Sequence, residues 1–370
     1  MKRKFFVFSI LLYMPIALLA QENDSFTLRG TIVGTSAKKV YLRMTDLITK
    51  EGVVDSTFVI DGKFVFRGKL PRPVYGGVSA SDGSFGAAFW MGNENVTIRA
   101  IAGMHAADIQ GSVEQDIMNV WNGEEEARFK ASYDEMTGKV KNARAMEDEV
   151  ALKQAEKEKK DWEKGYAAFR EDMIKKYPRS YFALNSVDGL WLQDKYRYED
   201  LSRVFGYIDP ELQDCPQGRR LARAITELKK TSVGQLIPDV AEHDADGHEV
   251  KISDYRGKYL LLTIGGIGVS TYDMKISDRI SLYNKYHDSG LDMLDILWEK
   301  DASKMKKMTI EKKIPWILIS DLKSAGNAAN KILYVEKIPT TFLLDPNGRI
   351  LAVDMEDEPL EMKIKELLNK

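Results

Sequence analysis

The stretch Tyr259-Leu-Leu-Leu-Thr-Ile-Gly-Gly-Ile-Gly-Val-Ser-Thr-Tyr-Asp273 decides the fold of the last part of the chain. Its apolar run from Tyr259 to Ile264 has the length and composition of a central strand that is buried on both faces. Glycines at positions 265, 266 and 268 then interrupt the run. Ser270 or Thr271 can cap a following helix, because a hydroxyl there accepts a hydrogen bond from a backbone N–H. The stretch therefore predicts a buried strand, a glycine-rich turn and the start of a helix.

Short motifs flank this stretch on both sides. They include Ile237-Pro238-Asp239 and Ser253-Asp254-Tyr255-Arg256-Gly257-Lys258 upstream, and Pro315-Trp316, Ser320-Asp321 and Ile338-Pro339-Thr340-Thr341-Phe342-Leu343-Leu344-Asp345-Pro346-Asn347-Gly348 downstream. In this order and spacing they resemble the TlpA-like branch of the thioredoxin superfamily, which consists of envelope thiol-disulfide oxidoreductases. The resemblance covers about the last 140 residues. It implies an α/β thioredoxin-like fold for residues 231–370.

The cysteine pair that carries this family's chemistry is missing. The family has Trp-Cys-x-x-Cys where the strand turns into the helix, and the resemblance places its two cysteine positions on Val269 and Tyr272. The only cysteine of the chain is Cys215, so no shift of the alignment brings a thiol into the turn. Thiol-disulfide exchange needs a thiolate as the attacking group. We therefore expect a thioredoxin fold that is catalytically inactive, and we expect no cofactor.

The resemblance also implies a binding surface. In thioredoxin-like proteins, the proline that Pro339 matches follows a cis peptide bond and faces the cysteine turn. The backbone N–H and C=O before such a proline stay free to pair with an extended peptide. We therefore expect the turn and the proline segment to meet, and a protein or peptide of the envelope to bind there through Val269, Ser270, Tyr272, Ile338 and Pro339. The alternative is that Pro339 serves folding alone.

Residues 26–112 have the pattern of short strands. Phe26-Thr-Leu-Arg-Gly30 alternates apolar and polar residues, which is the period of a half-buried strand. Asp61-Gly62 lies between two further alternating runs and predicts a hairpin, because a tight turn needs positive φ. The segment predicts a small antiparallel β sandwich or barrel. Its motifs Val40-Tyr41-Leu42, Asp61-Gly62-Lys63-Phe64 and Gly111-Ser112 resemble a β-rich domain of unassigned function that commonly precedes thioredoxin-like domains in envelope proteins.

Residues 113–230 are expected to be helical. Residues 124–176 are rich in Ala, Glu, Lys, Arg and Met, which are good helix formers. Trp162, Tyr166, Phe169 and Met173 recur at spacings of four, three and four residues, so they form an apolar stripe on one face of a helix. The whole chain is therefore expected to be a multidomain α+β protein. This helical middle region lies between the β-rich domain and the thioredoxin-like domain.

The first twenty residues have the features of a signal peptide. Lys2-Arg3-Lys4 is followed by the apolar run Phe5 to Leu19, and Leu18-Leu19-Ala20 suits signal peptidase. The alternative is a retained membrane anchor, but the run is shorter than the roughly 20 residues that span a bilayer. We expect cleavage after Ala20, export to the periplasm or cell envelope, and no transmembrane segment in the mature protein.

Composition and spacing argue against several other functions. The formal net charge is −2 and no basic cluster overrides it, which argues against nucleic-acid binding. The four histidines, at positions 105, 243, 248 and 287, lack the spacing of a metal site or a catalytic pair. The glycine-rich turn lacks the lysine and the full glycine pattern of a phosphate-binding loop.

Cys215 leaves an alternative function open. It lies in the turn-like stretch Asp214-Cys-Pro-Gln-Gly218 and cannot form a disulfide within the chain. Asp214 disfavours its thiolate, whereas Arg219 and Arg220 favour it. The first hypothesis is a non-catalytic module that binds a protein or peptide. The alternative is a residual thiol-disulfide oxidoreductase that uses Cys215. A third is that the β-rich domain binds a ligand such as a glycan or a lipid.

Overall fold

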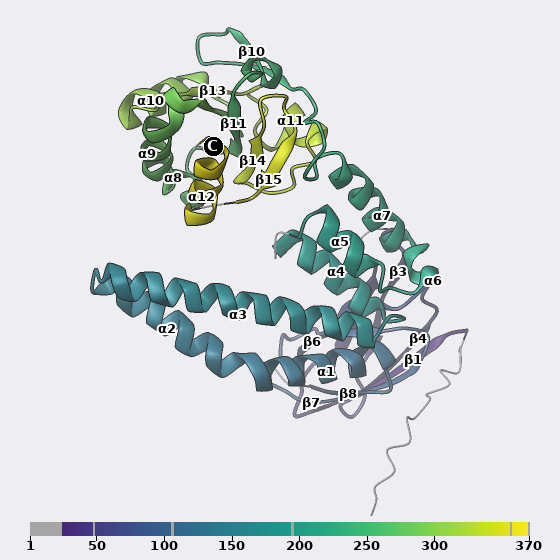
Figure 1. Cartoon of the computed structure of the whole chain (residues 1–370). Coiled ribbons are helices and arrows are strands. Elements are labelled where there is room, and N and C mark those ends of the chain that lie inside the picture. The colour runs from purple at the N-terminus through teal and green to yellow at the C-terminus, as the bar shows by residue number, and fades with distance from the viewer. Residues whose placement is uncertain (1–23, 47–48, 105–106, 194–195, 356, 369–370) are drawn as a thin grey trace, which may run out of the picture. The chain divides into compact units, whose positions relative to one another are not determined.

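The computed structural model describes residues 24–46, 49–104, 107–193, 196–355 and 357–368. These residues form two compact units that divide between Gly123 and Glu124 (Figure 1). In the part of the chain that the structure describes, no helix is long and apolar enough to cross a membrane.

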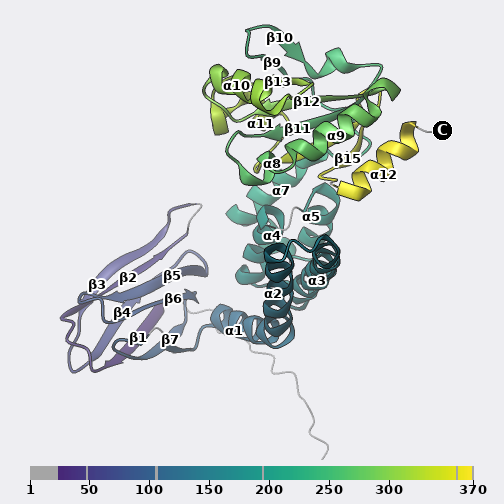
Figure 2. The ribbon, with the colours of Figure 1, turned by 90° about the vertical axis from the view of Figure 1, so that its left-hand side faces the viewer.

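Two four-stranded sheets face each other in the first unit (Figure 2). One sheet has the strand order β4-β1-β7-β8 and the other has the order β3-β2-β5-β6. The helix α1 (Val113–Glu125) follows the last strand. The strands are β1 (Phe26–Val33), β2 (Lys39–Thr45), β3 (Gly52–Phe58), β4 (Lys63–Gly68), β5 (Val74–Ala80), β6 (Gly86–Met91), β7 (Asn95–Ile101) and β8 (Ala107–Gln110).

The alternating pattern of the sequence builds this sandwich. In β1, alternate residues are buried, and Leu28 packs in one core with Phe66 of β4 and Val40 of β2. The two sheets do not close into a barrel, so the sandwich is the correct one of the two predicted forms. The prediction of a purely antiparallel sandwich is wrong in one place, because β1 and β7 are parallel. The strands β1 and β7 are not joined by a hairpin, because strands of the other sheet lie between them in the sequence. Their connection therefore does not require an antiparallel arrangement.

The predicted hairpin at Asp61-Gly62 is only a turn. Both residues have positive φ, 48° and 71°, as a tight turn requires. Only Ile60 and Lys63 pair across it, as an isolated bridge. The strands on either side, β3 and β4, belong to different sheets. The turn therefore forms a corner that carries the chain from one sheet to the other.

The helical region begins the second unit. Its elements are a π-helical segment (Glu126–Lys130), α2 (Ala131–Ala145), α3 (Glu149–Lys176), α4 (Tyr181–Gln193), α5 (Tyr198–Phe205), α6 (Pro210–Gln213) and α7 (Pro216–Lys229). The predicted stripe packs as expected, because the Phe129 ring lies 5.8, 5.4 and 5.3 Å from the rings of Trp162, Tyr166 and Phe169.

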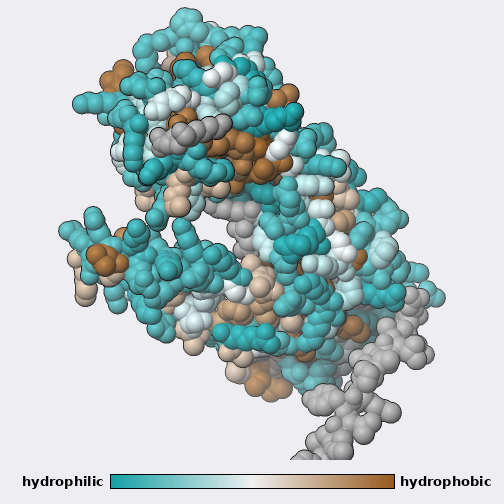
Figure 3. All heavy atoms as spheres, in the orientation of Figure 1, coloured by the Kyte–Doolittle hydropathy of each residue, from teal (hydrophilic) through white to brown (hydrophobic). Residues whose placement is uncertain are grey.

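The turn between α2 and α3 lies at the tip of a long helical hairpin (Figure 1). The Asp148 carboxylate caps α3 by accepting from the Ala151 N–H at 3.0 Å. Figure 3 shows a mostly hydrophilic surface along this hairpin, as the charged sequence predicts, with apolar spheres at the tip. Met146 and Val150, on either side of the turn, are 78% and 82% exposed.

A five-stranded sheet forms the core of the remaining residues. Its order is β13-β12-β11-β14-β15; β11, β12 and β13 are parallel, and β14 and β15 are antiparallel to their neighbours. The strands are β11 (Tyr259–Gly265), β12 (Leu291–Leu297), β13 (Ile317–Ile319), β14 (Thr340–Leu344) and β15 (Ile350–Val353), and a small hairpin of β9 (Ala241–His243) and β10 (Glu249–Lys251) precedes them. This is the order of a thioredoxin-like sheet that the resemblance implies.

Helices and loops cover both faces of this sheet. Successive residues of β11 point to opposite cores: Leu261 to one, and Leu260 and Leu262 to the other. The first core also receives side chains from α9 (Ile276–Tyr286), α10 (Ala302–Lys312) and α12 (Asp357–Leu368). The second receives α11 (Ala328–Ile332). The Asn327 side chain caps α11 by accepting from the Ala329 N–H at 2.7 Å.

Backbone hydrogen bonds connect other segments to both edges of the sheet. The segment 234–237, which follows α7, pairs with the start of β15: the Gly234 N–H donates to the Ile350 C=O at 2.7 Å, and the Ile350 N–H donates to the Gln235 C=O at 2.9 Å. At the other edge, the Ser320 N–H that follows β13 donates to the His243 C=O at 3.0 Å.

Candidate functional site

The glycine-rich turn connects β11 to a single helical turn, α8 (Ser270–Asp273). The residue at the N-terminal cap of α8 is Val269, and no side chain caps the helix there. The prediction that Ser270 or Thr271 caps it is therefore wrong. The carboxylate of Asp273 holds the turn instead, because it accepts from the N–H of Gly268 at 3.0 Å. Gly268 has a φ of 85°, which glycine adopts readily.

The turn meets the segment that contains Pro339. The Ile338–Pro339 bond is cis, as the resemblance implies. A Cβ atom on Gly266 would lie 3.0 Å from Cδ1 of Ile338 and 3.3 Å from Cγ2 of Val269. Glycine at position 266 thus lets two loops approach each other that are about 70 residues apart in the sequence. Ser270 is exposed, whereas Val269, Ile338 and Pro339 are half-buried.

Tyr272 does not belong to this surface. Its side chain is 1% exposed, and its ring fills the space above Gly265, where a Cβ would lie 2.3 Å from Cδ2 of the ring. The prediction that Tyr272 binds a partner is therefore wrong for its side chain. The reason is tertiary packing, since the ring lies over Gly265 and the hydroxyl is bonded to Asp295 of β12.

A buried cluster of polar side chains holds Tyr272 in place. Its hydroxyl donates to Oδ2 of Asp295 at 2.6 Å, and Nη1 of Arg279 donates to the same oxygen at 3.0 Å. Nη2 of Arg279 donates to the other carboxylate oxygen, and its guanidinium lies 4.9 Å from the ring centroid of Trp316. Burial, followed by the charge of Asp295, raises the pKa of Tyr272 well above its usual value, so the phenol stays protonated.

The sequence contains one indication of this cluster. Asp295 is an acidic residue in the middle of a buried strand, and a buried carboxylate needs a cationic or hydrogen-bonding partner. Arg279 lies on the helix that precedes that strand. This pairing was therefore accessible to sequence reasoning, whereas the presence of Tyr272 in the same cluster was not.

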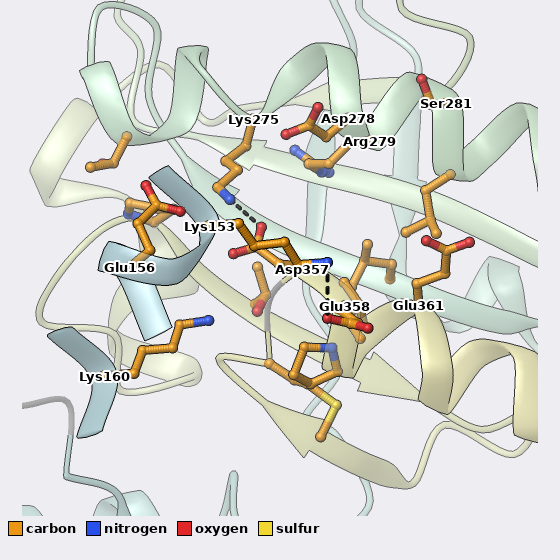
Figure 4. Close-up of a pocket in the computed structure, with 18 of the residues that line it drawn as sticks. Lys153, Glu156, Lys160, Lys275, Asp278, Arg279, Ser281, Asp357, Glu358 and Glu361 are labelled. Carbon is orange, nitrogen blue, oxygen red and sulfur yellow. Dashed lines mark hydrogen bonds and ion pairs between the residues drawn. The ribbon is translucent and has the colours of Figure 1, made fainter. Parts of the chain in front are cut away.

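A large groove opens beside the turn, with a volume of about 1380 Å³. Thr271 and Lys275 line it from the side of α8, and Pro339 and Thr341 line it from the proline segment. Figure 4 shows charged residues around it, including Lys153, Glu156 and Lys160 of α3 and Asp357, Glu358 and Glu361 of α12. Lys275 pairs with Asp357, and Lys153 lies 3.9 Å from Glu358.

Arg197 connects the helical region to the proline segment. Its Nε donates to Oδ2 of Asp354 at 3.0 Å, and its Nη2 donates to Oγ1 of Thr340, the residue after Pro339, at 3.2 Å. Oδ1 of Asp354 accepts from the N–H of Thr341 at 3.1 Å. Sequence reasoning missed this contact, because nothing in the pattern around Arg197 indicates a partner so distant in the chain.

Cys215 lies away from the turn. It is the N-terminal cap of α7, where its Sγ accepts from the Gly218 N–H at 3.4 Å, and it is half-buried. The helix begins at Pro216, directly after Cys215. In Figure 1, this end of α7 lies beside α6, at the end of the helix that is far from the C-terminal sheet. The 14 residues of α7 span about 20 Å at 1.5 Å per residue.

His243 and His248 do not build a metal site. The exposed His248 ring contacts the Asp244 carboxylate, with Nδ1 and Oδ2 3.1 Å apart, within the turn between β9 and β10. Among the described residues, no group of three or more His, Cys, Asp or Glu side chains is arranged to hold a metal ion.

Comparison with known proteins identifies two segments of the chain. Residues 26–118 match the family described as "Domain of unknown function (DUF4369)", and residues 233–353 match the AhpC/TSA family. The chain is 28% identical over 146 residues to the thiol-disulfide oxidoreductase ResA of Geobacillus kaustophilus, which covers 38% of this chain and 82% of that protein. It is 27% identical over 165 residues to the mitochondrial thioredoxin-dependent peroxide reductase of Drosophila melanogaster, which covers 40% of this chain and 69% of that protein.

Solved structures resemble the same part of the chain. A thiol-disulfide oxidoreductase from Bacteroides fragilis is 25% identical with a TM-score of 0.35, and the match covers 36% of this chain and 100% of that one. The thioredoxin domain of a thiol-disulfide oxidoreductase from Bacteroides vulgatus is 22% identical with a TM-score of 0.35, covering 37% and 99%. On the family match and the sheet order together, residues 233–353 are a thioredoxin-like domain of the AhpC/TSA family, and a DUF4369 domain precedes them at residues 26–118.

Proposed function

We propose that the thioredoxin-like domain binds a protein or peptide beside Pro339 without exchanging disulfides. The close approach of Val269 and Ile338 at Gly266 carries this proposal, because it places two half-buried apolar side chains beside a groove. The backbone of Ile338 supports it. Neither its N–H nor its C=O has a hydrogen-bond partner among the described residues, so both are available to an extended chain.

The residues at the two cysteine positions support a non-catalytic role. Val269 has no ionisable group. Tyr272 is buried, and its hydroxyl is hydrogen-bonded to Asp295. A disulfide exchange needs a thiolate that reaches a disulfide sulfur. The one thiol of the chain belongs to Cys215, at the N-terminal end of α7. The length of this helix, about 20 Å, separates it from the segment that enters the domain. We propose that the domain keeps the binding surface of its family and lacks its redox step.

The expected site of action is outside the cytoplasm. The first twenty residues have the charge and apolar pattern of a signal peptide, and we propose that the partner is a protein or peptide of the periplasm or cell envelope. Cell fractionation tests this part of the proposal. A chain that stays in the cytoplasmic fraction and is not cleaved after Ala20 would contradict it.

The first experiment measures disulfide reductase activity of residues 21–370 and of the same chain with Cys215→Ser. The expected result is that both are inactive. An active wild type with an inactive Cys215→Ser variant would make Cys215 the catalyst and would overturn the non-catalytic assignment.

The second experiment measures binding of a fluorescent, reduced and alkylated unfolded polypeptide by anisotropy. Val269→Asp and Ile338→Asp place a charge in an apolar contact and are expected to weaken binding at least about tenfold, which corresponds to about 1.4 kcal/mol. Ile310→Asp is the matched control, because Ile310 is 68% exposed on α10 and is not part of the contact at Gly266. Equal binding by all four proteins would contradict the proposed surface.

A further inference from the structure

The outer face of the sheet β4-β1-β7-β8 has an unusual composition. Residues that alternate with the buried ones point away from the sandwich core on all four strands. We call this set the cationic face. It consists of Thr27, Arg29, Thr31, Val33, Lys63, Val65, Arg67, Asn95, Thr97, Arg99, Ile101, Asp108 and Gln110.

The strand register fixes how these residues lie relative to one another. Arg29 on β1 is opposite Val65 on β4 and Thr97 on β7. One row further, Thr31 lies between Lys63 and Arg99. Neighbouring strands are about 4.8 Å apart and same-face residues about 6.8 Å apart along a strand. The cations therefore form a lattice that extends about 10 Å across the strands and about 14 Å along them.

This lattice carries positive charge on a protein whose net charge is negative. It has four cations, Arg29, Lys63, Arg67 and Arg99, and one carboxylate, Asp108, which lies 3.9 Å from Arg99. In the described part of the chain, no ion pair joins Arg29, Lys63 or Arg67 to a carboxylate. The formal net charge of the whole chain is −2. A face of this sign complements an anionic surface.

The same face also exposes large apolar side chains. Val33 and Ile101 are neighbours across β1 and β7, and they are 61% and 52% exposed. Ile60, which pairs with Lys63 across the corner turn, is 71% exposed, and Val65 is 39% exposed. Exposed apolar side chains grouped on one face indicate a contact surface.

We propose that the cationic face, together with Ile60, binds an anionic lipid surface. Cations near a negatively charged leaflet each gain about 1 kcal/mol, and apolar side chains between them gain further by entering the boundary between headgroups and acyl chains. A soluble polyanion would satisfy the arginines and the lysine, but it would leave Val33, Ile60, Val65 and Ile101 in water. The combination of both residue types on one sheet face therefore favours lipid over a hydrated polymer.

The test is co-sedimentation of residues 21–370 with phosphatidylcholine vesicles, with and without phosphatidylglycerol. Residues 1–20 are left out, because their apolar run would bind lipid by itself. We expect binding only when phosphatidylglycerol is present, and we expect the binding to weaken as salt is raised. Arg29→Gln and Lys63→Gln are each expected to lower vesicle affinity about fivefold. Ile60→Ser is expected to lower it as well.

Two controls lie on the outer face of the other sheet. Arg43→Gln removes a cation and Val54→Ser an exposed apolar side chain there, and both are expected to bind vesicles as the wild type does. Equal circular dichroism spectra establish that all variants are folded. Binding that ignores phosphatidylglycerol, or that the controls weaken as much as Arg29→Gln does, would overturn the proposal. Full competition by soluble dextran sulfate with an unchanged Ile60→Ser variant would assign the face to a polyanion instead.

Discussion

Glu242 of β9 is the most unusual carboxyl group of the C-terminal domain. Its side chain is 1% exposed. One oxygen, Oε2, accepts from Nδ2 of Asn327 at 3.0 Å, while Oε1 is buried without a hydrogen-bond partner among the described residues. Burial raises the pKa of Glu242 to about 7, and the Asn327 hydrogen bond lowers it only in part. The folded protein therefore holds this proton more tightly than the unfolded chain does.

The free energy of unfolding should depend on pH through Glu242. Below about pH 4.5 the group is protonated in both states; between pH 4.5 and 7 the unfolded chain releases the proton first, so stability falls as pH rises. The loss is on the order of 3 kcal/mol at pH 8. Glu242→Gln should remove most of this slope and stabilise the protein at pH 8 by about 2 kcal/mol, since its amide N–H₂ stays unpaired at a cost of about 1 kcal/mol.

Urea denaturation at pH 5 and pH 8 measures this effect. The matched control is Glu249→Gln, because Glu249 is exposed on the paired strand β10. If the wild type and Glu242→Gln lose the same stability between the two pH values, the assignment to Glu242 is wrong.

At the scale of single residues, the sequence predicts which chemical groups are present at the site better than it predicts how each side chain is buried. The absence of thiols at Val269 and Tyr272 follows from the sequence and the family motif, and so does the cis proline at position 339. The burial of Tyr272 does not follow, because it depends on the Asp295–Arg279 pair and on the missing Cβ of Gly265. Three chain segments have to meet before that environment exists.

At the scale of elements, the hairpin of α2 and α3 depends on one aromatic contact. Phe129 lies in the π-helical segment before α2 and contacts three rings of α3. Phe129→Ala should lower the free energy of unfolding by about 3 kcal/mol, the low end for losing a phenylalanine in a core, since Phe129 is half-buried. Hydrogen exchange should rise across residues 131–160.

A variant on the exposed side of the same hairpin is the control. Tyr133 is 47% exposed and contacts only Trp162 among the rings of the described hairpin. Tyr133→Ala should change stability by less than about 1 kcal/mol. Equal exchange rates in both variants would show that Phe129 does not hold the hairpin together.

Most element types were predictable because their periodicity is local. The strands of the two sheets in the first unit follow from alternation of apolar and polar residues, and the apolar stripe of α3 follows from helical spacing. The parallel pairing of β1 with β7 and the corner turn at Asp61-Gly62 were not predictable. In both cases the local signal is compatible with two pairings, and contacts with distant strands select one.

At the scale of the whole molecule, Arg197 is a partly buried polar link between the helical region and the thioredoxin-like domain. Its guanidinium contacts Asp354 and Thr340 and is 20% exposed. Arg197→Ala leaves the Asp354 carboxylate, which is 10% exposed, without its cation. The expected loss of stability is about 2–3 kcal/mol, below the loss for a fully buried pair. Hydrogen exchange of residues 334–341 should increase.

Arg179→Ala provides the comparison for this variant. Arg179 also pairs with an aspartate, Asp209, but its side chain is 82% exposed. An ion pair of that kind contributes at most about 1 kcal/mol, and residues 334–341 should exchange as in the wild type. If Arg197→Ala leaves exchange of this segment unchanged, the link does not hold the proline segment in place.

The covered edges of the C-terminal sheet have a consequence for self-association. An open strand edge is a template on which another chain can add a strand, and this is a common route to ordered aggregates. Here the segment 234–237 pairs with Ile350 at the start of β15, and His243 pairs with Ser320 directly after the three-residue strand β13. A second copy therefore has less open strand edge on which to add in this domain. The segment that carries the chain out of α7 thus also shields the start of the edge strand β15 from strand addition.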